Sequence, residues 1–207
     1  MEQAVLQLTG HPRRIKPFDL AGRTDRRIAR DLLLTSDSTP TPKDIERLIE
    51  VYLVFLEQNV AKTPYRPIRN IRKAVHALRN AGCMVGLGTG NAKRGAEIKL
   101  ASAGIADLFD FSLGGYGDDA ESRADVLRVA VRRCDPAGGK TIIVIGDTPS
   151  DVQAACDIGA LSIAVATGLF NEATLRRTRA SAVANGLGAG AAKTIAAILL
   201  TRQMQDE

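Results

Sequence analysis

The 207-residue chain is 45% hydrophobic and 25% charged, and its 28 basic residues exceed its 23 acidic ones. This composition excludes a collagen-like, coiled-coil or wholly disordered chain, and the length suits one or two domains with a buried core. No run approaches the ~20 consecutive apolar residues of a membrane helix, and the segment starting at Met1 lacks a secretory layout. We therefore expect a cytoplasmic protein that binds no membrane.

The cysteine, histidine and arginine contents argue against zinc-binding or disulfide-rich proteins, histidine-dependent hydrolases and nucleic-acid-binding proteins. The three cysteines suit neither a zinc site nor a disulfide framework, and two histidines leave little basis for a Ser-His-Asp or Cys-His enzyme. The densest basic segment, residues 13–30, is interrupted by acidic residues and has few aromatic neighbours. We interpret it as a solvated face, or one attracting small anions, and expect no nucleic-acid partner.

Residues 1–64 predict helices and loops without a strand. Residues 1–8 are typical of part of a helix, and Thr24 can cap a short helix over 25–34. The strongest start signal follows Thr41, with Pro42 at the first helical position and Asp44 three residues after the cap. Apolar residues then recur at helical spacing as far as residue 60. These patterns predict a small helical bundle.

From residue 65 onward, short apolar runs alternate with helical patterns. We expect helices at 67–80, 92–103 and 122–134, strands at 83–87, near 111–113, at 141–145 and 161–165, and final helices from Asn171 and from about Ala191. This alternation predicts an α/β fold whose Rossmann-like parallel sheet is covered on both faces. In such sheets the chemistry lies at the carboxyl ends of the strands, so the residues after Leu87 and Ile145 are the first candidates.

The run Gly88-Thr89-Gly90-Asn91 follows the first of these strands and opens a helix. A hydroxyl and backbone N–H groups at a helix N-terminus can hold an anion. Alternatively, Thr89 and Asn91 serve only as helix caps. The glycine spacing is not that of a dinucleotide-binding loop, and no strand ending in an acidic residue follows about 20 residues later.

Two carboxylates, Asp147 and Asp151, follow the strand at 141–145. One stands at the strand end and the other on the first helical turn, so both can face one point. Hard oxygen ligands in this arrangement suit Mg²⁺. Alternatively, Asp147 caps the turn and Asp151 complements the positive end of the helix dipole.

Several segments together resemble the haloacid-dehalogenase-like (HAD) hydrolases, in their phosphoglycolate-phosphatase-like branch. The sequence GDTPSDVQAACDIGALSIAVATG resembles the family's fourth motif, VGLGTGN its second, and GGYGDDAESRADVLRVAV the segment that carries its third-motif cation, here Arg123 in place of the usual lysine. The segments FDLAGRTDRRIARDLL and PYRPIRNIRKAVHALRNAG resemble the helical cap and its return to the core. The resemblance implies a helical cap over residues 1–64 and a HAD-like core over 65–207.

The resemblance also implies a function. Members typically hydrolyse phosphate monoesters through an aspartyl-phosphate with Mg²⁺, so the implied partner is a small phosphorylated metabolite. Thr89 with Gly90 and Asn91 would hold the phosphoryl oxygens, and Arg123 would neutralise nucleophile and phosphate. Asp147 would bind the metal, and Asp151 would either bind it as well or hold one of its ligands. Alternatively, Arg123 is a surface residue at a helix start.

The family's first motif, an apolar strand ending in D-x-D-x-[TV], is missing. The segment from Phe18 echoes it, but Ala21 replaces the second acid, the preceding residues are polar and interrupted by proline, and the segment itself resembles the cap. We therefore expect a chain that lacks the first central strand and the nucleophile and is inactive as written. We favour a truncated product. A complete protein without the central strand would have unpaired backbone groups on both neighbouring strands, and their cost would exceed the stability of a domain. A non-catalytic phosphate- or metal-binding or regulatory relative is the alternative.

Overall fold

A computed structural model describes residues 1–16, 20–35 and 38–188. The chain forms two compact units. The first, here called the helical unit, joins residues 1–66 with 86–138, and the second, the sheet unit, joins 67–85 with the described residues after 138. The helical unit therefore contains the predicted cap together with part of the predicted core. The assignment of 1–64 as cap and 65–207 as core stays a prediction.

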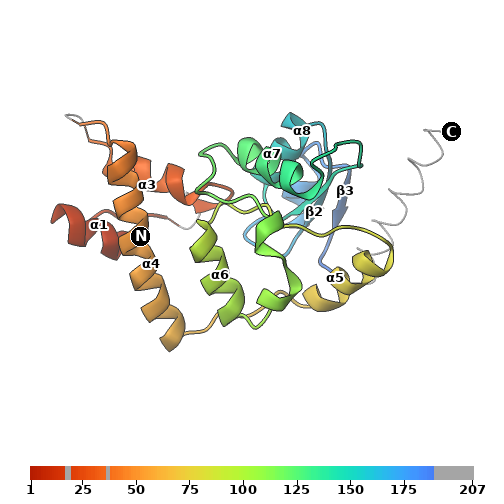
Figure 1. Cartoon of the computed structure of the whole chain (residues 1–207), viewed down its shortest axis with the longest axis horizontal. Helices are drawn as coiled ribbons and strands as arrows, with labels where there is room; N and C mark the ends of the chain where they lie inside the picture. Colours follow the sequence, from red (N-terminus) through yellow and green to blue (C-terminus); the bar gives the residue numbers. More distant parts are fainter. Residues whose placement is uncertain (17–19, 36–37, 189–207) are drawn as a thin grey trace. The chain divides into compact units, whose positions relative to one another are not determined.

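The helical unit is built around one long helix, α4, which packs against α1, α3 and α6 (Figure 1). Its buried face carries Ile45, Leu48 and Leu56, which contact Val5 of α1 and Ala29 of α3 in one apolar core. The elements of this unit are α1 (Glu2–Thr9), α3 (Asp25–Leu33), α4 (Pro42–Lys62), α6 (Lys93–Ser102), α7 (Arg123–Cys134) and two 3₁₀ turns, η1 (Ala106–Leu108) and η2 (Phe111–Leu113). The predicted helical periodicity after Thr41 is therefore confirmed as a core-facing stripe.

The predicted start of α4 is confirmed by its hydrogen bonds. The Thr41 hydroxyl accepts the backbone N–H of Asp44 at 3.3 Å, and the Asp44 carboxylate accepts the backbone N–H of Thr41 at 2.9 Å. This reciprocal pair is a capping box, and Pro42 occupies the first turn, where no N–H is needed. Thr24 caps α3 as expected, because its hydroxyl accepts the N–H of Arg27 at 3.1 Å.

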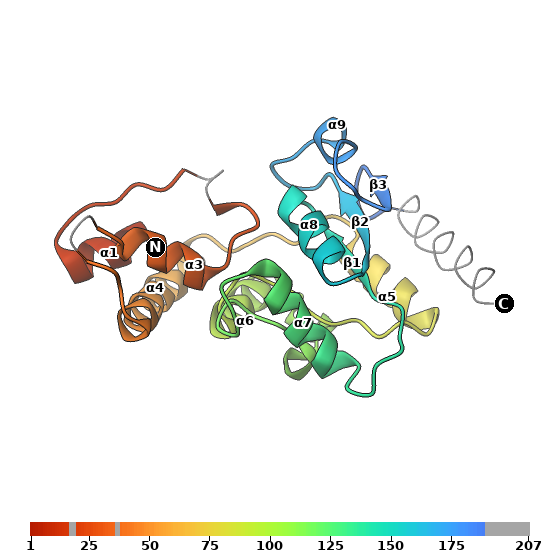
Figure 2. The ribbon, with the colours of Figure 1, turned by 90° about the horizontal axis from the view of Figure 1, so that it is seen from above.

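The sheet unit contains a parallel three-stranded sheet in the order β1-β2-β3. Its strands are β1 (Ile143–Gly146), β2 (Leu161–Val165) and β3 (Ala182–Ala184), and its helices are α5 (Ile71–Asn80), α8 (Pro149–Asp157) and α9 (Glu172–Leu175). Ala164 of β2 packs with Val152 of α8 and Leu175 of α9, whereas Ile163 packs with Leu78 of α5. Successive residues of a strand face opposite sides, so helices cover both faces of the sheet (Figure 2). The predicted α/β class with a parallel sheet is confirmed.

The predicted strand at residues 83–87 is wrong. This segment has only an isolated parallel bridge beyond its end, between Gly88 and Gly115. There the N–H of Thr89 donates to the carbonyl of Gly115 at 3.0 Å, and the N–H of Gly115 donates to the carbonyl of Leu87 at 2.9 Å. An apolar run becomes a strand only where a neighbouring segment supplies a continuous ladder, and here the pairing is confined to one residue.

The predicted strand near 111–113 is also wrong, because this segment forms the 3₁₀ turn η2. The Asp110 carboxylate accepts both the backbone N–H and the hydroxyl of Ser112, at 2.8 and 2.6 Å. Such a local side-chain bond stabilises a turn and competes with a sheet ladder.

The remaining differences concern boundaries. Helix α5 begins at Ile71 rather than 67, after Asn70 with a φ of 67°, and β1 begins two residues later than expected. Helix α9 is a single turn capped by Asn171, and β3 was not predicted.

The helix expected from Ala191 and the Phe18–Asp19 pair lie outside the described residues. No helix in the described part of the chain is both long and apolar enough to cross a bilayer.

Candidate functional site

The loop Gly88–Asn91, here called the glycine loop, is held in the helical unit by backbone hydrogen bonds from separate segments. The N–H of Asp25, at the start of α3, donates to the carbonyl of Gly90 at 2.6 Å. The N–H of Gly117 donates to the carbonyl of Asn91 at 2.7 Å. With the Gly88–Gly115 bridge, these bonds hold both ends of the loop and its centre. The loop is therefore positioned by tertiary contacts rather than by its own turn geometry.

Gly90 permits the close approach of α3. A Cβ at this position would overlap the carbonyl oxygen of Arg23 and would stand 3.1 Å from the Cα of Thr24. Any side chain at Gly90 would therefore displace the N-terminus of α3. The segment resembling the family's cap thus contacts the predicted phosphate-binding loop directly, through Arg23 and Thr24.

The Thr89 hydroxyl is held by Asn91. Its oxygen accepts the side-chain N–H of Asn91 at 2.8 Å and the backbone N–H of Asn91 at 3.2 Å. The Asn91 side-chain oxygen accepts a hydrogen bond from the ammonium of Lys99. The backbone N–H of Asn91 is therefore bound to Thr89, and the Thr89 hydroxyl and the N–H of Gly90 are the groups that the loop can offer to an anion.

The start of α6 already carries two carboxylates. The N–H of Ala92 donates to Asp25 at 2.9 Å, and the N–H of Lys93 donates to Asp118 at 2.6 Å. Neither Thr89 nor Asn91 caps α6, whose N-cap residue is Ala92. Sequence reasoning missed both aspartates, because Asp25 lies 67 residues and Asp118 25 residues away along the chain.

Asp25, which is buried, and Lys99, which is half-buried, are charged groups in the same part of the helical unit. Asp25 is only 7% exposed. Burial raises the pKa of Asp25, while the Lys99 charge and the Ala92 N–H act in the opposite direction. Burial lowers the pKa of Lys99, and the Asp25 charge opposes that shift. Each of the two groups thus reduces the cost of burying the other.

Arg123 is the first residue of α7, and it is half-buried. This helix packs under the glycine loop, because a Cβ at Gly88 would stand 2.5 Å from a methyl carbon of Leu127. The structure therefore places the predicted cation on a helix that contacts the predicted phosphate loop, within one unit.

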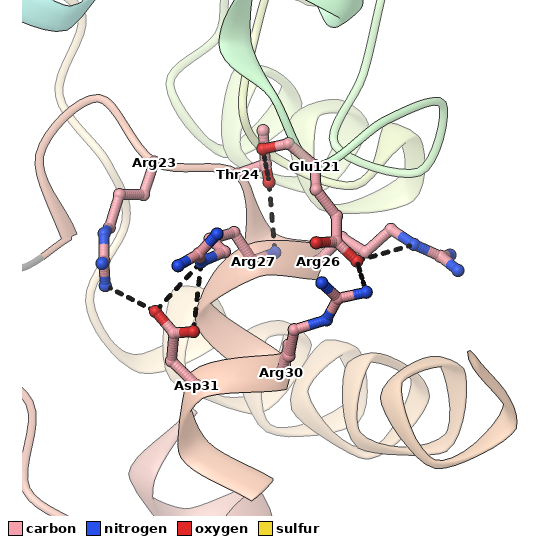
Figure 3. Close-up of polar contacts among 7 residues, drawn as sticks. All are labelled: Arg23, Thr24, Arg26, Arg27, Arg30, Asp31 and Glu121. Atoms are coloured by element: carbon pink, nitrogen blue, oxygen red, sulfur yellow. Dashed lines mark hydrogen bonds and ion pairs between the residues drawn. The ribbon is translucent and has the colours of Figure 1, made fainter. Parts of the chain in front are cut away.

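The residues preceding α7 join it to the arginine-rich helix α3 (Figure 3). The carbonyl of Glu121 accepts the hydroxyl of Thr24 at 2.9 Å, and its carboxylate pairs with Arg30 at 2.7 Å. On the opposite side of α3, Asp31 pairs with Arg23 and Arg27 at 3.0 and 3.1 Å. These pairs are consistent with the interpretation of the basic segment as a solvated face with its own counter-charges.

In the sheet unit, Asp151 holds the start of α8. Its carboxylate accepts the backbone N–H of Thr148 at 3.1 Å and the Thr148 hydroxyl at 2.8 Å, and the Thr148 oxygen accepts the N–H of Asp151 at 3.1 Å. Asp151 is 4% exposed. This buried capping box follows the strand directly, so α8 begins at a defined position beside the carboxyl end of β1.

Asp147, the residue between β1 and Thr148, lies against the loop after β2. A Cβ at Gly168 would overlap the Asp147 carboxylate, so the backbone of Gly168 packs directly on that group. The adjacent residue, Thr167, has a buried hydroxyl oxygen without a hydrogen-bond partner in the described part of the chain. Sequence reasoning missed Thr167, although its place two residues after a predicted strand was a usable signal.

The Asp147 carboxylate and the Thr167 hydroxyl are oxygen ligands that fit a magnesium ion. Mg²⁺ takes oxygen ligands, often one or two carboxylates with several waters, and a buried hydroxyl without a partner is a place where such a water can bind. Within residues 1–16, 20–35 and 38–188, no three His, Cys, Asp or Glu side chains converge into a metal cluster. The arrangement therefore suits a hydrated ion held by Asp147, rather than an all-protein cage.

The sequence-predicted residues thus fall into two groups. Thr89, Gly90 and Asn91 lie together in the helical unit with the helix of Arg123, and Asp147 lies near Asp151 in the sheet unit. That the two groups form one site stays a prediction.

Comparison with family models shows which protein family the chain belongs to. Residues 15–159 match the family model of the haloacid dehalogenase-like hydrolases. The chain belongs to this family. No curated protein matches the chain in a sequence search. The HAD-like chain does have the fold of several solved relatives, each less than 25% identical to it.

A HAD hydrolase of family IA from Entamoeba histolytica is 16% identical, with a TM-score of 0.63 over 90% of this chain and 83% of that one. CbbY from Rhodobacter sphaeroides, solved with phosphate, is 17% identical, with a TM-score of 0.60 over 90% and 86% of the two chains. A hydrolase from Pseudomonas syringae is 16% identical, with a TM-score of 0.61 over 87% and 82%. These likenesses show that the chain has the fold of the HAD hydrolases.

Proposed function

We propose that this HAD-like chain belongs to a Mg²⁺-dependent phosphatase that acts on a small phosphate monoester through an aspartyl-phosphate. The observation that carries the proposal is the turn Gly146–Asp151. There, a buried capping box between Thr148 and Asp151 follows Asp147 at the carboxyl end of β1. Gly168 packs on the Asp147 carboxylate, and the preceding Thr167 has a buried hydroxyl without a hydrogen-bond partner in the described part of the chain. The phosphate-bound neighbour CbbY supports the same class of ligand.

Each site residue has a proposed role. The Thr89 hydroxyl donates to a phosphoryl oxygen, together with the N–H of Gly90. Asn91 supports Thr89 instead of contacting the ligand through its own backbone N–H, which Thr89 already accepts. Arg123 neutralises negative charge on the phosphate, and Asp147 holds the metal while Asp151 fixes the turn. When bound, Mg²⁺ supplies charge neutralisation at the phosphoryl group.

We further propose that these 207 residues bind phosphate and metal without turnover. The sequence contains no D-x-D pair that could serve as nucleophile and general acid. In the described residues β1 pairs only with β2, and Ile145 on β1 is 37% exposed. This open edge is where the family resemblance places a further central strand, and an added strand would cover it. The favoured source is a segment outside these 207 residues; the alternative is a non-catalytic relative.

The test combines an assay with two titrations. p-Nitrophenyl phosphate hydrolysis is measured with and without Mg²⁺, and binding of inorganic phosphate and of Mg²⁺ is measured by calorimetry. We expect binding without turnover, and loss of Mg²⁺ binding in Asp147→Asn. Turnover that Asp147→Asn abolishes would show that the chain contains its own nucleophile. Absence of any phosphate binding would contradict the proposed function itself.

A second experiment separates truncation from a non-catalytic relative. Reading the in-frame DNA for about 40 codons before Met1 should reveal a short apolar strand ending in Asp-x-Asp, and a chain extended by this segment should gain Mg²⁺-dependent phosphatase activity. If a stop codon precedes Met1 immediately and the chain folds cooperatively, the non-catalytic alternative is correct.

We also propose a cytoplasmic location, which the free thiols of Cys83, Cys134 and Cys156 support.

A further inference from the structure

The Lys99 side chain determines the orientation of the Asn91 amide. Lys99 lies on α6, ten residues after Thr89, and its ammonium contacts the side-chain oxygen of Asn91. An ammonium has three donors and no acceptor, so only the oxygen of the amide can face it. The amide nitrogen must then face the other way, toward Thr89, whose oxygen it contacts at 2.8 Å.

The Thr89 hydroxyl is thereby left as a donor. A hydroxyl oxygen has two acceptor positions and one proton. Both acceptor positions are taken by N–H groups of Asn91, one from its side chain and one from its backbone. Within the described residues, no acceptor takes the Thr89 proton. The proton is therefore available to an external acceptor, and a phosphoryl oxygen is such an acceptor.

We propose that Lys99 is a positioning residue, which acts through Asn91 to keep the Thr89 hydroxyl proton free for an anionic oxygen of the ligand. This inference rests on the proposed phosphate-binding role of Thr89. Without Lys99, the Asn91 amide can rotate by half a turn and present its oxygen to Thr89. The hydroxyl would then donate to Asn91 and would no longer serve the ligand.

The surroundings of Lys99 hold its ammonium in place. Its nitrogen lies 5.9 Å from the centre of the Tyr52 ring on α4, within the range of a cation–π contact. The buried Asp25 supplies a compensating charge while its carboxylate is bound to the N–H of Ala92. Helices α3, α4 and α6 therefore jointly position a side chain that contacts the glycine loop.

The test is a double-mutant cycle on phosphate affinity in the full chain, with inorganic phosphate as the probe. Lys99→Met keeps most of the side-chain volume and removes the donor, and Thr89→Val removes the hydroxyl. We expect each single variant to weaken phosphate binding about tenfold, because each loses a hydrogen bond to a charged group. The double variant should bind no more weakly than Thr89→Val alone, since Lys99 acts through that hydroxyl.

Lys93→Met is the matched control. It removes the same charge from the same helix, but the Lys93 side chain contacts the Tyr116 ring rather than Asn91. We expect a change of less than about twofold, because an exposed charge is screened. Equal losses in Lys93→Met and Lys99→Met would attribute the effect to net charge and overturn the proposal. Additive losses in the cycle would also overturn it.

A second readout does not depend on phosphate. The side-chain N–H₂ of Asn91 should give slowly exchanging NMR resonances that change in Lys99→Met and persist in Lys93→Met. Unchanged resonances in Lys99→Met would overturn the positioning role, even if the wild-type chain binds no phosphate and the proposed function fails. Should Lys99→Met not fold, Asn91→Asp keeps an acceptor for Lys99 but offers Thr89 a carboxylate. We expect it to weaken phosphate binding at least as much as Thr89→Val, and unchanged affinity would contradict the proposal.

Discussion

Arg133 and Asp119 form a two-pronged ion pair in which the two guanidinium nitrogens donate to the two carboxylate oxygens at 2.9 and 2.8 Å. Arg133 also donates to the carbonyl of Gly114, and Asp119 accepts the backbone N–H of Tyr116 at 2.8 Å. The pair therefore ties the end of α7 to the segment that contains Gly115, the bridge partner of the glycine loop. Its role is to hold that segment against the helix that carries Arg123.

We expect Asp119→Asn to lower the free energy of unfolding by about 1–2 kcal/mol, because two charge-assisted bonds are lost at a partly exposed site. Urea unfolding followed by circular dichroism measures this change. The control is Asp125→Asn on α7, which breaks an exposed pair with Arg128. It should cost less than about 0.5 kcal/mol. An equal loss in both variants would show that the Asp119 pair has no special role.

The pH dependence of stability should carry opposite contributions from two aspartates. Burial raises the pKa of Asp25 above its ordinary value of 3.8. The folded state then binds a proton more tightly than the unfolded state, so the Asp25 contribution to stability falls as pH rises from about 4 through the raised pKa. Urea unfolding of wild type and Asp25→Asn across pH 4–7 checks this; the difference between them should shift in favour of the variant as pH rises.

Asp119 should show the opposite sign. Burial acts to raise its pKa, but the hydrogen bond and charge of Arg133 and the Tyr116 N–H together lower it. Its contribution to stability is therefore complete above the ordinary pKa and is lost as pH falls through the lower, folded-state value. The stability difference between wild type and Asp119→Asn should shrink on acidification below about pH 4. A difference that is constant from pH 2 to pH 7 would contradict this.

Gly90→Ala should destabilise the chain by about 1–3 kcal/mol and weaken phosphate binding, because the new methyl group overlaps the Arg23 carbonyl and α3 must shift. Thermal unfolding and phosphate titration measure the two effects. Gly188→Ala is the control, since the nearest atom to a Cβ there is the side-chain nitrogen of Asn70 at 4.0 Å. Wild-type behaviour of Gly90→Ala would show that the loop and α3 separate without cost.

Thr148→Ala should cost more than Thr41→Ala, although both remove the hydroxyl of a capping box. An exposed cap contributes about 1 kcal/mol, whereas loss of the Thr148 hydroxyl takes one hydrogen bond from a carboxylate that is 4% exposed, for which we expect about 2–3 kcal/mol. Chemical unfolding of both variants measures the difference. Thr148→Ser, which keeps the hydroxyl, should recover most of the stability; failure to do so would assign the loss to the methyl group.

The helix starts could be predicted from the sequence because their causes are local. Thr41 and Asp44 lie three residues apart, as do Thr148 and Asp151, so the capping bonds depend only on residues within one turn. Asp147 and Thr89 were singled out on a local signal as well, since each comes one glycine after an apolar run. The parallel sheet followed from alternation of strand and helix patterns.

Contacts between distant segments were decided only by the tertiary structure. Residues 83–87 have the composition of a strand, but strand formation requires a partner ladder, and only Gly115 provides one bond pair there. Asp25 and Asp118 bind the first N–H groups of α6. Neither contact has a sequence signature. A hydrogen bond between segments depends on how the helices pack, and packing brings together residues whose separation along the chain is arbitrary.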